Sequence, residues 1–171
     1  MSRPRRLVDA VLSLVRAAAA PAGPRRAPRR APGAARRGAA GAGPDVDTEY
    51  RPRADGRPDP GEVVWAWVPY DEGDGRGKDR PVLVVGRRGP DLVGLVLTSK
   101  DHDRDAADEA RQGRTWMDVG SGGWDRQGRP SEVRLDRLLV LDPGEVRREG
   151  AALDRAVFDR VVAAARRLQG W

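Results

Sequence analysis

Short runs of β-branched, aromatic and aliphatic residues recur between residues 62 and 141, and polar, glycine-rich segments separate them. Runs of this length and composition are typical of strands, and the turn-forming residues between them mark where each strand ends. The pattern predicts five strands, at residues 62–68, 80–85, 92–99, 115–119 and 131–141. The charged stretch at 101–113 predicts a loop or a short helix.

After Pro143 the spacing of apolar residues changes from the period of a strand to that of a helix. One face of a single final helix then collects the apolar residues Leu153, Val157, Phe158, Val161, Val162, Ala165 and Leu168. Several short strands followed by one helix predict a mainly β protein of the α+β class. We expect a small, strongly bent antiparallel sheet or a partly closed barrel with a C-terminal helix.

The periodic pattern is missing before residue 61. Residues 21–60 are rich in Ala, Pro, Arg and Gly, and such a segment buries too little apolar surface to offset its ordering entropy. We therefore expect residues 1–60 to form a disordered basic tail, ahead of a globular domain at 61–171. A short amphipathic helix near residues 5–18 is an alternative for the start of the tail. A signal peptide is disfavoured there, because Asp9 and Arg16 interrupt the apolar stretch.

Charge is distributed unevenly along the chain. Residues 1–44 hold ten arginines and one acid, which gives +9, so the remaining residues sum to −3 within a total of +6. The basic total thus describes the tail, and for the globular part bulk charge gives no support to nucleic-acid binding. With no Cys and one His, the composition excludes disulfides, thiolate metal sites and His-rich metal sites. No run reaches the roughly 20 apolar residues of a membrane-spanning helix, so none is expected.

Two stretches that begin like ligand-binding loops are incomplete. Residues 120–123 are glycine-rich but lack the Lys-Ser/Thr ending of a phosphate-binding loop. Residues 101–105 alternate acids as a calcium loop does. However, Ala106 stands where the turn glycine is needed, and Gln112 stands where the bidentate Glu is needed. We interpret residues 101–105 as a solvated acidic loop, and we expect no metal and no cofactor.

Polar residues at strand ends are the remaining candidates for chemistry. Arg80 begins the second predicted strand, and Thr98 and Ser99 end the third. Arg134 and Asp136 alternate with apolar residues on the fifth strand, so both point to one face. A guanidinium, two hydroxyls and a carboxylate could together bind and cleave a phosphodiester. From spacing alone, a surface ion pair and an ordinary strand-forming Thr explain the same residues.

Four blocks, in order, resemble the successive motifs of the MazF/PemK toxin family: 61–65 (GEVVW), 80–85 (RPVLVV), 96–99 (VLTS), and 133–136 (VRLD) followed by 140–142 (VLD). The resemblance includes the closing helix and leaves the first 60 residues outside. It implies an SH3-like, partly closed antiparallel barrel that forms a homodimer. It also implies a cytoplasmic toxin of a type II toxin–antitoxin system, which cleaves single-stranded RNA without a metal, and a partner antitoxin that fills the RNA groove.

The same resemblance implies roles for individual residues. The functional Arg of the family corresponds to Arg80, the hydroxyl that ends the third strand corresponds to Thr98 with Ser99 beside it, and the Arg-x-Asp pair corresponds to Arg134 and Asp136. Many members carry a His or Gln in the loop before the Arg-Pro block. Here that loop contains Lys78, which could supply positive charge instead. The single histidine, His102, lies outside the motif and is expected to be an exposed loop residue.

Cleavage by the adjacent 2′-hydroxyl would leave a 2′,3′-cyclic phosphate and a 5′-hydroxyl. Arg80 suits charge stabilisation through bidentate hydrogen bonds, and Thr98 can add another hydrogen bond. Asp136 is the candidate base, and the general acid is unassigned. Trp124 is a candidate for stacking on an RNA base, with core packing as its alternative.

Two other functions remain open. One is a non-catalytic SH3-like module that binds nucleic acid or protein, because similar barrels serve many functions. The other makes the arginine-rich tail the functional part, as an anchor to nucleic acid or an anionic membrane.

Overall fold

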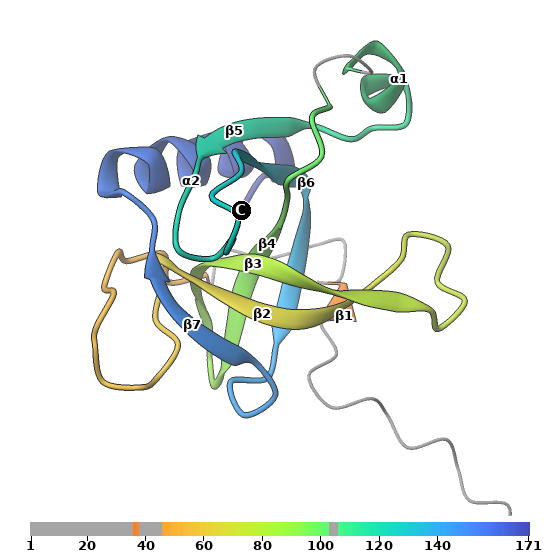
Figure 1. Ribbon diagram of the computed structural model, residues 1–171. Helices are drawn as coiled ribbons and strands as arrows, with labels where there is room; N and C mark the ends of the chain where they lie inside the picture. The colour runs from red at the N-terminus through yellow and green to blue at the C-terminus, as the bar shows by residue number, and fades with distance from the viewer. Residues whose placement is uncertain (1–35, 38–45, 103–105) are drawn as a thin grey trace, which may run out of the picture.

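The fold is a strongly curved antiparallel sheet with one long helix against it (Figure 1). The computed structural model describes residues 36–37, 46–102 and 106–171. All five predicted strands are confirmed as β2 (Glu62–Pro69), β3 (Gly77–Arg88), β4 (Asp91–Thr98), β5 (Trp116–Gly120) and β6 (Ser131–Leu141). The strand order is β1-β6-β4-β3-β2-β7, and β5 pairs with β6 outside this path. The predicted partly closed barrel with a terminal helix is therefore the observed architecture.

Two strands of the sheet were not predicted. β7 (Arg147–Ala152) pairs with β2, and β1 (Arg36–Arg37) pairs with β6 opposite Leu139 and Val140. Neither segment alternates apolar and polar residues, so the pairing partner rather than intrinsic pattern determines their conformation. Of the two alternatives for the charged stretch, a loop or a short helix, the structure has a short helix, α1 (Ala106–Arg111).

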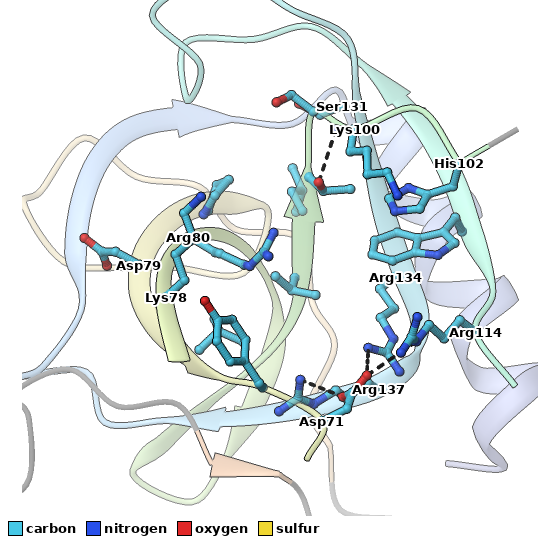
Figure 2. Close-up of a pocket in the computed structure, with 18 of the residues that line it drawn as sticks. Asp71, Lys78, Asp79, Arg80, Lys100, His102, Arg114, Ser131, Arg134 and Arg137 are labelled. Atoms are coloured by element: carbon cyan, nitrogen blue, oxygen red, sulfur yellow. Dashed lines mark hydrogen bonds and ion pairs between the residues drawn. The ribbon is translucent and has the colours of Figure 1, made fainter. Parts of the chain in front are cut away.

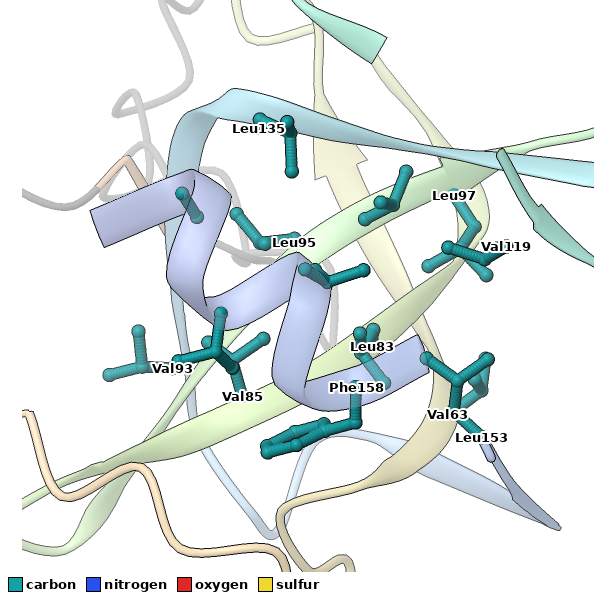
Figure 3. Packing of buried hydrophobic residues seen from close by; sticks show 14 of the residues in the cluster. Val63, Leu83, Val85, Val93, Leu95, Leu97, Val119, Leu135, Leu153 and Phe158 are labelled. Atoms are coloured by element: carbon teal, nitrogen blue, oxygen red, sulfur yellow. The ribbon is translucent and has the colours of Figure 1, made fainter. Parts of the chain in front are cut away.

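The two faces of the sheet bury different side chains. One face packs against α2 (Arg155–Gln169), and its cluster includes Leu83, Leu95 and Phe158 (Figure 3). The other face lines the inside of the curved sheet, with Val64, Ala66, Val82 and Val96 among its residues. Since successive side chains of a strand point to opposite faces, the near-continuous apolar runs of β3 and β4 supply both clusters.

Helix α2 begins and ends with standard capping groups. Asp154 is the N-cap, and its carboxylate accepts a hydrogen bond from the Val157 amide at 3.1 Å. Gly170 ends the helix in the left-handed conformation, with φ of 72°. The buried face contains Phe158, Val161, Val162 and Ala165, as predicted. Leu168 was placed on this face as well, which is wrong, because 49% of its surface is exposed.

Residues 46–60 pack on the barrel, so the expected unstructured segment does not extend through them. Asp47 forms a β-bridge with Arg87, and Val46 is buried. The Tyr50 hydroxyl donates to the Leu153 carbonyl at 2.8 Å. At Gly86 a Cβ atom would lie 2.3 Å from the Asp47 carbonyl oxygen, so only glycine lets the segment around Asp47 lie this close to β3. Residues 46–60 are called the arm below. The possible helix near 5–18 and most of the predicted tail lie outside the described residues.

Among the described residues, no helix has the length and hydropathy needed to cross a membrane.

Candidate functional site

A cavity of about 960 Å³ opens at the mouth of the barrel, beyond the buried residues of its interior face (Figure 2). Strands β2, β3, β4 and β6, the loop between β2 and β3, and the segment from α1 to β6 form its walls. Six of the seven predicted site residues line it: Lys78, Arg80, Thr98, Ser99, Trp124 and Arg134. The structure therefore brings together residues that lie up to 56 positions apart in the chain.

The register of the strands aligns three of the site's polar residues. The pairing of β3 with β4 ends at Val82 and Val96, and Arg80 and Thr98 each lie two residues farther along, on the same face as these valines. Thr98 lies opposite Glu132 of β6. Residues opposite one another in a ladder share a face. Arg80, Thr98 and Glu132 thus lie on one face of three neighbouring strands and are called the row below.

The β3 wall of the cavity carries two cations that have no partner among the described residues. Arg80 is half-buried and Lys78 is exposed, and both point to the same face of β3 because they are two residues apart. Within the described part of the chain, neither side chain forms a hydrogen bond or an ion pair. The pairing of β3 with β4 ends at Val82, so these two residues pair only with β2. Their charge is available to an anion in the cavity.

The hydroxyls of the site come from the end of β4. Thr98 is buried, with 9% of its surface exposed, and Ser99 is exposed. The Thr98 Oγ1 accepts a hydrogen bond from the backbone N–H of Lys100 at 3.2 Å. Because the oxygen accepts this bond, the hydroxyl hydrogen can be donated to a ligand.

The opposite wall, on β6, carries cations that are already paired. Asp71, from the loop between β2 and β3, accepts from Arg134 at 2.7 Å and contacts Arg137 at 3.0 Å. Arg114 lies 3.5 Å from the same carboxylate. One loop carboxylate therefore holds three guanidiniums, which Figure 2 shows converging on Asp71. The ion pairs join the loop to the wall of the cavity.

Asp136, the predicted base, is not part of the cavity wall. Its carboxylate accepts from the Arg134 guanidinium at 2.8–3.1 Å and from the Thr115 amide at 2.9 Å. Burial acts to lower the pKa of Arg134, but hydrogen bonds to Asp136 and Asp71 outweigh it, so the pKa is raised above its ordinary value. The geometry gives Asp136 a place behind Arg134, where it orients the guanidinium.

Trp124 adopts the alternative that the sequence left open for it. Only 4% of its surface is exposed, and it belongs to the cluster that packs against α2. Its indole N–H donates to the Ser131 hydroxyl at 3.1 Å, which satisfies its one polar atom. Trp124 also lines the cavity.

His102 differs most from expectation, because it is a buried cavity residue and not an exposed loop residue. It is 7% exposed, and its Nδ1 lies 2.8 Å from the Glu132 carboxylate. The imidazole stacks on Trp116 with ring centres 4.0 Å apart and planes 3° apart. Spacing could not reveal this cluster, since its residues meet only through strand pairing.

Trp116 connects His102 and Glu132 to the β6 wall, where the arginines are paired. Its indole N–H donates to Glu109 at 3.1 Å, and this hydrogen bond is the largest cause of the lowered pKa of the Glu109 carboxyl. The Arg134 guanidinium lies 6.0 Å from the centre of the same ring, within the range of a cation–π contact.

In the described ranges, no group of three or more His, Asp and Glu side chains is placed to hold a metal ion. Six arginines and two lysines line the cavity together with five carboxylates, several hydroxyls and the imidazole of His102, so its cations outnumber its acids. Such a set suits the recognition of an anion with several acceptor oxygens, such as a phosphodiester.

Comparison with known proteins gives the class of this fold and site. Residues 59–168 match the family model described as the PemK-like, MazF-like toxin of type II toxin–antitoxin systems. The chain belongs to this family.

Two solved structures from Deinococcus radiodurans are similar to it. A MazE–MazF complex is 20% identical with a TM-score of 0.45, and the match covers 66% of this chain and 96% of that one. A MazF structure is 19% identical with a TM-score of 0.45, and the match covers 67% and 98%. No curated protein matches the chain.

Proposed function

We propose that this protein is a metal-independent endoribonuclease that cleaves single-stranded RNA, as the toxin of a type II toxin–antitoxin pair. The observation that carries the proposal is the row formed by Arg80 and Thr98 at an open cavity, with a guanidinium that no described residue neutralises. The family gives the toxin class, and the chemistry of this row supports the substrate.

The cleavage that suits this row is attack of the RNA 2′-hydroxyl on the adjacent phosphorus. The phosphorane that forms carries extra negative charge on its non-bridging oxygens. The planar Arg80 fork can bind two of these oxygens, and the Thr98 hydroxyl can donate to one. Arg80 does not serve as the acid, because a guanidinium holds its proton far too strongly at neutral pH. The products are a 2′,3′-cyclic phosphate and a 5′-hydroxyl.

The other predicted residues receive supporting roles. Lys78 and Ser99 lie exposed at the rim beside the row and are placed to contact neighbouring phosphates. Arg134 binds substrate from the opposite wall, and we assign Asp136 to its orientation. Trp124 supports the cavity from the core. The antitoxin competes for the same cavity, the active form is a homodimer, and the RNA substrate places the reaction in the cytoplasm.

A digest of single-stranded RNA tests the proposal. Wild-type protein should cleave it in excess EDTA, and sequencing of the fragments should show cyclic phosphate and 5′-hydroxyl ends. Arg80→Ala should lower the single-turnover rate by about 10²–10³-fold, the scale for losing one preorganised donor to a developing charge. Arg80→Lys should restore little, because an ammonium cannot reproduce the fork.

Arg160→Ala is the matched control, because it removes the same charge from an exposed position on α2. Equal rates for Arg80→Ala and wild type would refute the site. A wild type that binds RNA or a protein without cleaving RNA would favour the non-catalytic binding module.

A further inference from the structure

The row of Arg80 and Thr98 stabilises charge but supplies no group for proton transfer at neutral pH. Cleavage of RNA needs one, because the departing 5′-oxygen is a strongly basic alkoxide unless it is protonated as it leaves. Histidine is the side chain whose ordinary pKa lies closest to neutral pH, and this chain has one histidine. It lines the same cavity.

Two contacts fix the orientation of the His102 ring. Nδ1 lies 2.8 Å from Glu132 Oε2, while the backbone N–H of His102 donates to Glu132 Oε1 at 3.2 Å. The ring then stacks flat on Trp116. A carboxylate on Nδ1 holds the imidazole in one orientation, which leaves Nε2 to exchange a proton.

The strand register connects this pair to the charge-stabilising row. Glu132, which holds the imidazole, is the residue directly opposite Thr98. Nε2 forms no hydrogen bond with a described residue, and it is not sealed off from solvent. Figure 2 shows His102 and Arg80 on different sides of one hollow, with Lys100 beside the imidazole. A phosphate bound between Arg80 and Thr98 would therefore have the imidazole on its β6 side.

We propose that His102 is the general acid of the cleavage reaction and that Glu132 is its positioning residue, an inference that rests on the proposed ribonuclease function. The bond from the 2′-oxygen to phosphorus forms while the bond from phosphorus to the 5′-oxygen breaks. Protonated His102 gives its Nε2 proton to the 5′-oxygen, and the 2′-hydroxyl proton passes to water. Water then returns a proton to His102, so the reaction is balanced.

The groups around the ring come from every element packed on it. Glu132 of β6 contacts it directly, and Glu109 of α1 lies behind Trp116. Lys100, Arg114, Arg134 and Arg137 are cations on the same side of the cavity. Of all these groups, Glu132 is the one within hydrogen-bonding distance of the imidazole, so its carboxylate holds the ring in place.

The deciding experiment compares two RNA substrates with the same mapped cleavage site. One carries the natural 5′-oxygen and the other a bridging 5′-sulfur, which leaves as a stable thiolate and needs no acid. His102→Gln should cleave the oxygen substrate about 10²-fold more slowly than wild type, the usual contribution of a positioned acid. On the sulfur substrate the two proteins should differ little. Equal losses on both substrates would overturn the proposal, as would no loss on either.

The wild-type protein provides a second test that does not depend on how a variant folds. The imidazole NMR signals of this chain belong to His102 alone. With the oxygen substrate, the fall in rate at high pH should follow the loss of the His102 proton seen by NMR, and with the sulfur substrate this fall should be absent. A rate profile independent of that titration would refute the assignment. If wild type cleaves neither substrate, the ribonuclease proposal itself fails.

Glu132→Gln tests the positioning role. It keeps the size and hydrogen-bonding capacity of the side chain and removes its charge. Cleavage of the oxygen substrate should slow, while cleavage of the sulfur substrate should stay close to the wild-type rate. An equal loss on both substrates would mean that Glu132 supports the fold alone.

Discussion

The two walls of the cavity carry cations in opposite states. On β3, Arg80 and Lys78 have no partner among the described side chains. On β6, Arg134 and Arg137 are held with Arg114 by the single carboxylate of Asp71. The two walls therefore have different roles. The β3 wall can bind an anion directly. On the β6 wall an anion must first displace the Asp71 carboxylate, so these cations contribute mainly to the stability of the fold and less to the affinity for the anion.

The largest expected effect is a contrast in stability between the walls. Arg137→Ala removes a buried guanidinium that bonds Asp71 and the Pro69 carbonyl, so it should lower the free energy of unfolding by about 2–3 kcal/mol. Arg80→Ala should change it by less than about 0.5 kcal/mol, because it breaks no ion pair with a described residue. Urea unfolding measures both, and similar losses would erase the distinction.

A shortened chain would make the two walls easier to compare, because the arginines before residue 36 would no longer contribute to RNA binding. Deleting residues 1–35 removes eight arginines and Asp9. Affinity for non-specific RNA should fall about tenfold at low salt, and its salt dependence should flatten, since fewer counterions are released. Stability should stay the same. Deletion through residue 58 should lower the melting temperature as well, because it removes the buried Val46 and the packed Tyr50. Equal melting of the two truncated chains would contradict the role of this arm.

Releasing the paired wall should raise affinity. Asp71→Ala frees the guanidiniums of Arg134, Arg137 and Arg114 from that carboxylate. Binding of a 2′-deoxy oligonucleotide should become about three- to tenfold tighter, and the salt slope should steepen by about one. Asp159→Ala is the control, since it removes the same charge from an exposed position on α2 outside the cavity. Weaker binding by Asp71→Ala than by the control would show that the ion pairs are needed to shape the site.

The smallest effect is a pH dependence on the paired side. The pKa of Glu109 is lowered, first by the Trp116 hydrogen bond and also by Arg114. Such a carboxyl adds stability above its ordinary pKa, about 4.3, and loses this contribution as the pH falls through the lower folded value. Glu109→Gln should therefore reduce the stability difference between pH 7 and pH 3 by roughly a few tenths of a kcal/mol. Thermal unfolding across this range measures it, and an unchanged difference would remove Glu109 from the network.

The strands with a strong apolar pattern could be predicted from the sequence. The runs at 62–68 and 131–141 contain enough β-branched and aliphatic residues to specify strands without help from a partner. β7 was missed because Arg147–Ala152 has no such pattern and forms by pairing with the edge of β2. Residues 46–60 were assigned to the tail because their few apolar side chains, such as Val46, do not repeat at a fixed spacing.

At the site, residues on strands were easier to predict than their partners. Arg80 lies in the first half of β3 and Thr98 ends β4, on the same face of neighbouring strands, so their positions could be predicted from the order of the strands. The environment of His102 depends on Glu132, which is 30 residues away and reached only through the pairing of β4 with β6. The pairing of Arg134 with Asp71 depends likewise on how a polar loop folds back over 63 residues. No local pattern encodes such contacts.

The arm at residues 46–50 lies against α2, so the two ends of the domain meet. Thr48 accepts a hydrogen bond from Arg166, and the Tyr50 ring lies 5.2 Å from that of Phe158. A short linker could join these ends, and the chain could then be opened elsewhere as a circular permutant. New termini between the exposed Gly73 and Gly75 would cut the loop that carries Asp71 without changing any residue of the cavity. In the permutant, Asp71 would keep its charge, but its loop would be attached to the barrel on one side only. The effect of the closed loop could thus be measured apart from the effect of the charge.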